Sequence, residues 1–140
     1  MDRFDLRAIA YALIGNHYHL IVATPDGRIS SALQQLHTWY SLRHNRRHER
    51  TAHLFRAHFF AREVKSDEDL LGTCRYVARN PVEAGLCDDP FLWRWSSAAA
   101  SAGLAEPEIP LDPGPLRAAL GDRGDWQRRY RAFIEAGKDL

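Results

Sequence analysis

Two histidines separated by one residue are the first side chains in this sequence whose spacing could support chemistry. His17 and His19 precede an apolar run, and residues 17–23 have the length and composition of a buried β-strand. Because alternate strand residues share a face, the two imidazoles would project together, roughly 6.5–7 Å apart along the strand. Two imidazoles at that spacing can bind one divalent cation. The chain has seven histidines, so a chance H-x-H triplet is the alternative interpretation.

A tyrosine and an asparagine four residues apart form the second candidate. Tyr76 and Asn80 would share one face of a helix. A phenolic oxygen can attack a phosphodiester when a cation polarises the phosphate, and a carboxamide oxygen can help to hold that cation. Such an attack would release a 3′-hydroxyl and leave a covalent 5′-phosphotyrosine. The alternative is structural, with a half-buried tyrosine that anchors its helix and an asparagine that ends it.

Basic residues cluster in the middle of the sequence, although the formal net charge is only +1. This local excess is compatible with phosphate binding. A solvated helix end is the alternative, because basic side chains favour helix C-termini. The cluster consists of Arg43, His44, Arg46, Arg47, His48 and Arg50, followed by Arg56, His58 and Arg62.

The hydrophobic pattern predicts an α+β scaffold for these side chains. Gly15 and Asn16 interrupt the apolar run, as a bulge or tight turn would. Ser30 or Ser31 could cap the first helix, and Ser66 could cap the tyrosine helix, which Pro81 would end. The predicted strands are residues 4–14, 17–23 and 58–64, and the predicted helices are residues 30–45, 66–80, 115–120 and 125–136. Apolar stripes at three- and four-residue spacing mark the first two helices: Ile29, Leu33, Leu36 and Tyr40, widened by Trp39 and Leu42, and then Leu70, Cys74 and Val77.

Composition narrows the protein class and the compartment. With 45% hydrophobic and 26% charged residues, the 140-residue chain has an ordinary globular composition. No apolar run reaches the roughly 18 residues of a membrane span, so no membrane partner is expected. The N-terminus lacks the form of a signal peptide, and Cys74 and Cys87 suggest no disulfide framework. A reducing, cytoplasmic location is therefore expected.

Taken together, these segments resemble the single-tyrosine HUH transposases, and most closely the branch called REP-associated tyrosine transposases. The resemblance covers roughly residues 4–100, and its most specific motifs are N-H-x-H-L and R-Y-x-x-x-N-P-V-x-A-G. The matching segments, in chain order, are residues 16–20, 45–48, 53–56, 76–85 and 95–97.

The resemblance implies a fold, a reaction and a set of site residues. The implied fold is a ferredoxin-like α+β sandwich with helices on one face of an antiparallel sheet, formed by residues 1–102 and followed by a helical extension at residues 103–140. Tyr76 would be the nucleophile, and His17, His19 and Asn80 would bind Mg²⁺ or Mn²⁺. The partner would be single-stranded or hairpin DNA, bound by a monomer or homodimer. The candidate DNA contacts are Arg43, Arg46, Arg47, Arg56, Arg62 and Arg79.

Two departures from the family pattern keep other interpretations open. Relatives begin with a further strand and helix before the segment that matches Phe4, so an N-terminally truncated sheet is expected, with an open edge or a substitute element. His58 stands where many relatives have arginine, which affects a DNA contact. The alternatives are a truncated module that binds DNA hairpins with little cleavage, a metal hydrolase that activates water, and a structural domain.

Overall fold

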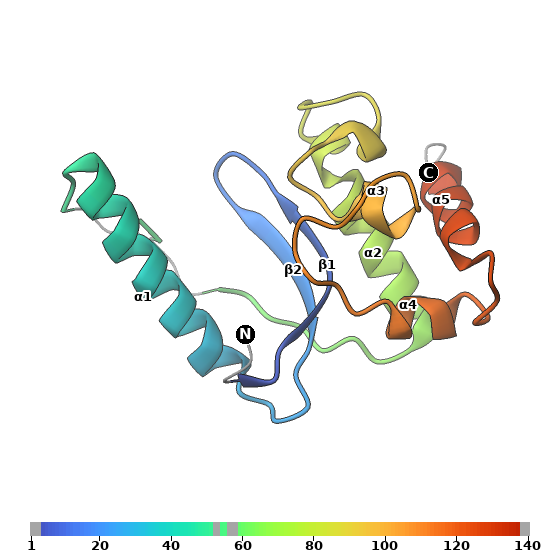
Figure 1. Cartoon of the computed structure of the whole chain (residues 1–140), viewed down its shortest axis with the longest axis horizontal. Coiled ribbons are helices and arrows are strands. Elements are labelled where there is room, and N and C mark those ends of the chain that lie inside the picture. Colours follow the sequence, from blue (N-terminus) through green and yellow to red (C-terminus); the bar gives the residue numbers. More distant parts are fainter. Residues whose placement is uncertain (1–3, 52–53, 56–58, 138–140) are drawn as a thin grey trace. The chain divides into compact units, whose positions relative to one another are not determined.

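The structure is a computed structural model that describes residues 4–51, 54–55 and 59–137 (Figure 1). These residues form an α+β fold with a two-stranded antiparallel sheet and five α-helices. The elements are β1 (Arg7–Leu13), β2 (Tyr18–Ala23), α1 (Ile29–His48), α2 (Asp67–Glu83), the 3-10 helix η2 (Pro90–Leu92), α3 (Ala98–Ser101), α4 (Gly114–Ala119) and α5 (Trp126–Ala136).

The chain divides into two compact units. One contains Met1–Leu6 and Thr24–Glu63, and the other contains Arg7–Ala23 and Val64–Leu140. The second unit therefore holds the β1–β2 hairpin together with α2 and everything after it. The residues predicted to form a C-terminal extension, 103–140, belong to the same unit as α2.

The β1–β2 hairpin closes through a tight turn at Gly15 and Asn16, one of the two alternatives predicted for this dipeptide. The Ile14 amide donates to the His17 carbonyl at 2.9 Å. The ladder pairs Ala12 with His19, so these two side chains share a face. The predicted strand, residues 17–23, included His17, but β2 begins one residue later, so His17 lies in the turn just before it.

A bulge in β1 adjusts which residues face the core. The register shifts between Ala8 and Ala10, so Ile9 is the extra residue. A bulge interrupts the alternation of side chains. Ile9 and Ala10, although adjacent in sequence, consequently both join the hydrophobic core.

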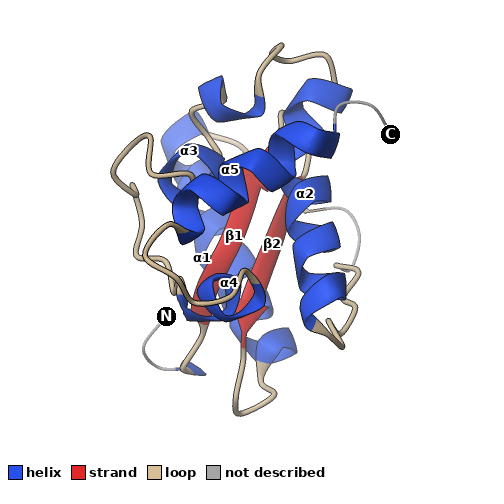
Figure 2. Cartoon of the chain, turned by 90° about the vertical axis from the view of Figure 1, so that its right-hand side faces the viewer, coloured by secondary structure: helices blue, strands red, loops and turns tan. Residues whose placement is uncertain are grey.

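The helices of this unit lie on one side of the hairpin (Figure 2). The predicted apolar stripe of α2, Leu70, Cys74 and Val77, is buried and packs in the same core as Ala10, Ala12 and Ile21. Burial of one large aliphatic side chain contributes about 1.5–3 kcal/mol. The core also includes Leu116 of α4 and Tyr130 and Ile134 of α5.

The start of α2 is as predicted, but its end is not. The Ser66 hydroxyl accepts from the Asp69 amide at 3.0 Å, and acidic residues occupy the first turn. The helix does not end at Asn80 but continues through Pro81 to Glu83. Pro81 has no N–H to donate to the carbonyl four residues earlier, and its ring is buried.

The second edge of β1 is covered by later segments of the chain. The Leu13 amide donates to the Trp95 carbonyl at 2.7 Å, and the Ser97 amide donates to the Tyr11 carbonyl at 3.0 Å. Further along, the Asp112 amide donates to the Ala8 carbonyl at 2.8 Å. Later segments of the chain therefore supply hydrogen bonds to the second edge of β1. The resemblance to the transposases had predicted either an open edge or a substitute element.

The strand predicted at residues 58–64 is not present. Residue 58 lies outside the described part, and residues 59–65 have no regular secondary structure. Phe60 is 91% exposed. Aromatic composition favours a strand only where a neighbouring strand and a packed face are available, and the described residues show no such pairing here.

In the other unit, α1 is longer than predicted and begins differently. It runs from Ile29 to His48, and neither Ser30 nor Ser31 caps it, because both lie within its first turn. Of its residues only Ala32 and Leu33 are buried. The apolar stripe predicted here instead leaves its larger members exposed: Leu36, Trp39, Tyr40 and Leu42.

None of the described helices has the length and apolar character required to cross a lipid bilayer.

Candidate active site

The hairpin and α2 bring three of the predicted site residues together. The rings of His17 and His19 have centroids 5.1 Å apart at an interplanar angle of 87°. The ring of Tyr76 lies edge-on to His19, with centroids 5.3 Å apart at 78°. We call these three side chains the His–Tyr cluster. It forms because His19 lies on the sheet face against which α2 packs.

His19 is the inner member of the cluster. It is half-buried, and its Nε2 atom is buried with no hydrogen-bond partner. Burial lowers the pKa of this imidazole below its usual value of 6.5, and the charge of His17 lowers it further. Burial thus favours the neutral form of His19, which is the form that binds a metal ion.

His17 is the outer, exposed member and has a neighbour that sequence reasoning missed. Its Nδ1 atom lies 2.6 Å from Oδ1 of Asn16. The motif N-H-x-H contains this asparagine, but its contact depends on the turn that folds it back onto the next residue. The only signal in the sequence was an asparagine immediately before a candidate ligand.

Tyr76 combines a fixed backbone with an accessible side chain. Its neighbours Cys74 and Val77 are buried in the core, whereas Tyr76 itself is 60% exposed. Among the described residues no hydrogen bond involves its hydroxyl group. The phenolic oxygen is therefore open to a substrate while the helix position is set by packing.

Asn80 lies one helical turn beyond Tyr76. A separation of four residues corresponds to about 6 Å along the helix axis and places both on one face. Asn80 is half-buried, and no ring contact or hydrogen bond of its side chain joins it to His17 or His19 in the described structure. The geometry therefore groups the two histidines with the tyrosine and leaves Asn80 one helical turn from Tyr76.

The side chains of His17, His19 and Asn80 are the candidate ligands of a divalent cation. No group of three or more His, Cys, Asp or Glu side chains with metal-binding geometry occurs among the described residues. The candidate ligands here are instead two imidazoles and one carboxamide oxygen, so they do not form a group of that kind. The orphaned Nε2 of His19 beside a second imidazole fits a cation that keeps open positions for water or phosphate oxygens. His17 and His19 would hold such an ion, with Asn80 as an additional oxygen donor.

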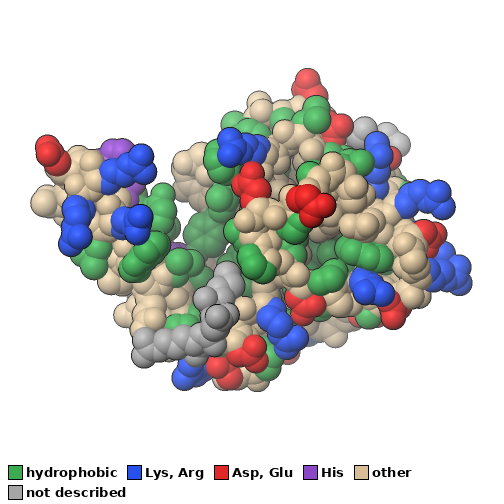
Figure 3. Space-filling view, viewed as in Figure 1, with side chains coloured by type: hydrophobic (Ala, Val, Ile, Leu, Met, Phe, Trp, Pro, Cys, Tyr) green, Lys and Arg blue, Asp and Glu red, His purple; other side chains and the backbone are tan. Residues whose placement is uncertain are grey.

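The predicted DNA contacts lie in several different environments. Arg43, Arg46 and Arg47 are exposed on the C-terminal half of α1, where hydrophobic, His and basic side chains gather (Figure 3). The Arg43 guanidinium lies 5.3 Å from the centre of the Trp39 ring. Arg62 is exposed in the irregular segment after α1. Arg56 lies outside the described residues.

Arg79 differs from the other candidate DNA contacts because it is largely buried. Its side chain is 12% exposed and lies 3.9 Å from the Glu83 carboxylate. One helical turn earlier, the Arg75 guanidinium stacks 3.7 Å from the centre of the Phe133 ring on α5. Both arginines also flank Gly137, where an added Cβ would meet Arg75 at 2.6 Å. The position of Arg79 therefore indicates a packing role between α2 and α5.

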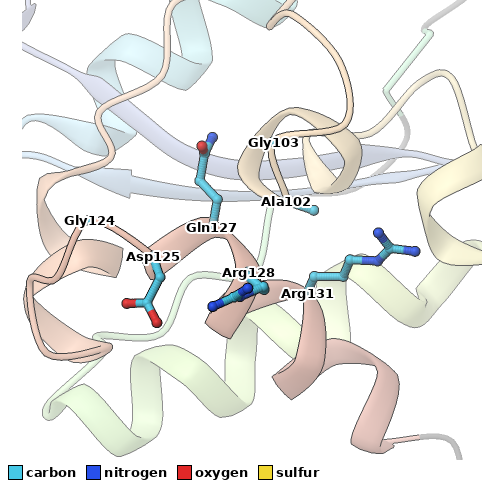
Figure 4. Close-up of a pocket in the computed structure, with 7 residues that line it drawn as sticks. All are labelled: Ala102, Gly103, Gly124, Asp125, Gln127, Arg128 and Arg131. Atoms are coloured by element: carbon cyan, nitrogen blue, oxygen red, sulfur yellow. The ribbon is translucent and has the colours of Figure 1, made fainter.

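A hollow of about 510 Å³ in the same unit lies apart from the His–Tyr cluster. It is open to solvent, and Gln127, Arg128 and Arg131 line it from α5 (Figure 4). None of the cluster's three residues lines it. The acidic residue at its rim, Asp125, is paired with Arg129 at 3.2 Å.

Comparisons of the chain with protein-family models, with curated proteins and with solved structures found no match.

Proposed function

We propose that this protein nicks single-stranded DNA and transfers the strand through a covalent 5′-phosphotyrosine, in the manner of single-tyrosine HUH transposases. The observation that carries the proposal is the His–Tyr cluster. An exposed phenol lies 5.3 Å, between ring centroids, from a histidine that is itself 5.1 Å from a second histidine. The sequence motifs that resemble the transposases supply the same three residues.

The proposed reaction assigns one role to each side chain. The Tyr76 oxygen forms a bond to phosphorus, the bond from phosphorus to the 3′ oxygen breaks, and that oxygen leaves as a hydroxyl. The phenolic proton passes to solvent, which reaches the exposed Tyr76, and solvent protonates the leaving oxygen. A divalent cation held by His17 and His19 would supply charge stabilisation at the phosphate. The phosphotyrosine conserves the bond energy needed to reseal the strand.

Other features support a nucleic-acid substrate. The exposed Trp39 and Arg43 of α1 combine an aromatic face with a guanidinium, the pairing on which single-stranded bases stack. Arg46 and Arg47 occupy the last turn of α1 and are exposed. A ferredoxin-like sandwich is part of the same proposal, supported by a tyrosine helix that packs on the histidine strand.

A covalent-adduct assay tests the proposal. Labelled hairpin-bearing single-stranded DNA is mixed with the protein and Mn²⁺ and separated on a denaturing gel. We expect label at the mass of the protein, lost in Tyr76→Phe and His19→Ala and lost with a chelator. Tyr40→Phe is the matched control, because it removes an exposed hydroxyl from α1 and should leave the adduct unchanged.

The other outcomes of this assay identify the alternatives. DNA that is bound in a native gel without any adduct would indicate a hairpin-binding module. Cleavage without an adduct that persists in Tyr76→Phe would indicate a hydrolase that uses the histidines and water. Folded protein with neither binding nor adduct would overturn the nucleic-acid proposal.

A further inference from the structure

The contact between Asn16 and His17 is unusual because neighbouring residues form it in an exposed turn. The turn is closed by the Ile14 amide, which donates to the His17 carbonyl at 2.9 Å. Within it, Asn16 Oδ1 lies 2.6 Å from His17 Nδ1. This distance is shorter than the range of about 2.7–3.2 Å in which most N–H···O bonds fall. This contact orients the His17 ring relative to the Asn16 carboxamide.

The chemistry of the contact determines the tautomer of His17. A carboxamide oxygen only accepts hydrogen bonds, so Nδ1 must carry the hydrogen. A neutral imidazole has a single N–H, which leaves a lone pair on Nε2. A metal ion requires such a lone pair, and ligating histidines in general donate their other N–H to an oxygen.

The two histidines are held in place by different means. The ring of His19 is half-buried and packed edge-on between His17 and Tyr76. His17 is exposed. Among the described residues, the one ring contact of His17 is with His19. The hydrogen bond that His17 Nδ1 donates to Asn16 Oδ1 therefore restrains the exposed histidine as burial restrains His19.

We infer that Asn16 is a positioning residue that holds His17 with its Nε2 lone pair directed to a divalent cation shared with His19. The inference rests on the proposed metal-dependent function. It assigns Asn16 no contact with the ion, because its carboxamide oxygen is already engaged by the His17 ring. Loss of a hydrogen-bond partner behind a ligand typically lowers metal affinity about 10- to 100-fold.

Two variants separate the hydrogen bond from the bulk of the side chain. Asn16→Leu keeps a similar size and removes the acceptor, whereas Asn16→Asp keeps an acceptor oxygen in place. Gln34→Leu, at an exposed carboxamide of α1, serves as the control for loss of a surface amide. The folded state of each full-length protein is checked by its amide NMR spectrum.

Imidazole nitrogen NMR of the metal-free protein, with ¹⁵N-labelled histidine, is the first readout. We expect His17 as the Nδ1–H tautomer in the wild type and in Asn16→Asp, and a mixture of tautomers in Asn16→Leu. The Nε2–H tautomer in the wild type would overturn the inference, because the carboxamide would then be donating to the ring.

Titration with Mn²⁺, followed by the relaxation of water protons, is the second readout. We expect a Kd about 10- to 100-fold higher in Asn16→Leu and an unchanged Kd in Gln34→Leu. An equal Kd in the wild type and Asn16→Leu overturns the positioning role even if the adduct forms. If Asn16→Leu changes both the His17 tautomer and the Kd for Mn²⁺ but the wild type forms no adduct, the positioning role of Asn16 stands and strand transfer is rejected.

Discussion

The protonation of His19 is coupled to folding. Its folded-state pKa is lowered, first by burial and then by the charge of His17. The unfolded chain therefore takes up this proton first as the pH falls. The stabilising contribution is complete above the unfolded value of 6.5 and is lost as the pH falls from there through the lower folded value.

The first prediction follows from that sign. The free energy of unfolding of the wild type, measured by urea denaturation, should decline below pH 6.5 more steeply than that of His19→Asn, which has no group to titrate. The difference between the two proteins should become constant once the pH is below the folded pKa of His19. Parallel curves for the two proteins would show that His19 is not held neutral by burial.

The thiol of Cys74 gives a second prediction at the residue scale. Burial raises its pKa to about 12, because the thiolate would lose its hydration. We expect Cys74 to react with a thiol reagent only after unfolding, whereas Cys87 is partly accessible. The Cys87→Ser variant isolates Cys74, and rapid labelling of that variant in native buffer would contradict the packing of α2.

Sequence reasoning predicted the proximity of residues that are close in the chain. His17 and His19 could be paired because a strand alternates its side chains, and the structure brings them within 5.1 Å. The contact of Asn16 could not be predicted, because it depends on the dihedral angles of a four-residue turn. The burial of Arg79 against the C-terminal part of α5 was equally invisible, because it arises between segments far apart in sequence.

At the scale of elements, the hydrogen bonds along the second edge of β1 carry a measurable share of stability. The Tyr11 amide donates to the Ser97 hydroxyl at 2.9 Å. Ser97→Ala leaves this amide without its acceptor, which should lower the free energy of unfolding by about 1–3 kcal/mol. Ser30→Ala, at an exposed position of α1 with no capping bond, should change it by less than about 0.5 kcal/mol. Equal effects of the two substitutions would mean that the hydrogen bond between the Tyr11 amide and the Ser97 hydroxyl is not formed.

The C-terminal helix makes a separate prediction, because α5 shares its core with α2. Ile134 is fully buried, so Ile134→Ala should cost about 2–5 kcal/mol by loss of packing and creation of a cavity. Leu104→Ala is the matched control at a side chain that is 49% exposed. Chemical denaturation of both variants decides the matter, and a small effect at Ile134 would show that the extension is not part of this core.

Element prediction failed where the outcome depended on partners rather than on local pattern. The stripe of α2 and the Ser66 cap are local features, and both are confirmed. Residues 58–64 have strand composition, but the described residues 59–64 have no neighbouring strand to pair with. Pro81 is a local signal to end a helix, yet α2 continues to Glu83. The buried ring of Pro81 packs within the last turn of this helix.

At the scale of the whole molecule, DNA affinity should depend on salt through the basic end of α1. Each phosphate contact on a single strand contributes about −0.7 to the slope of log K against log salt concentration. The double substitution Arg46→Ala with Arg47→Ala should flatten this slope by up to about 1.4. Arg117→Ala removes an exposed arginine that is paired with Asp122 and is the control. An unchanged slope in the double variant would show that Arg46 and Arg47 do not contact phosphates in the proposed complex.

The closure of the second edge of β1 also has a consequence during protein synthesis. Tyr11 and its partner Ser97 are 86 residues apart, and ribosomes add about 5–20 residues per second. Tyr11 therefore waits about 4–17 s after its synthesis for the segment that satisfies its backbone groups. Until then the second edge of β1 lacks these partners and is available to neighbouring nascent chains on the same message, so we expect the yield of folded protein to depend on how quickly translation reaches residue 97.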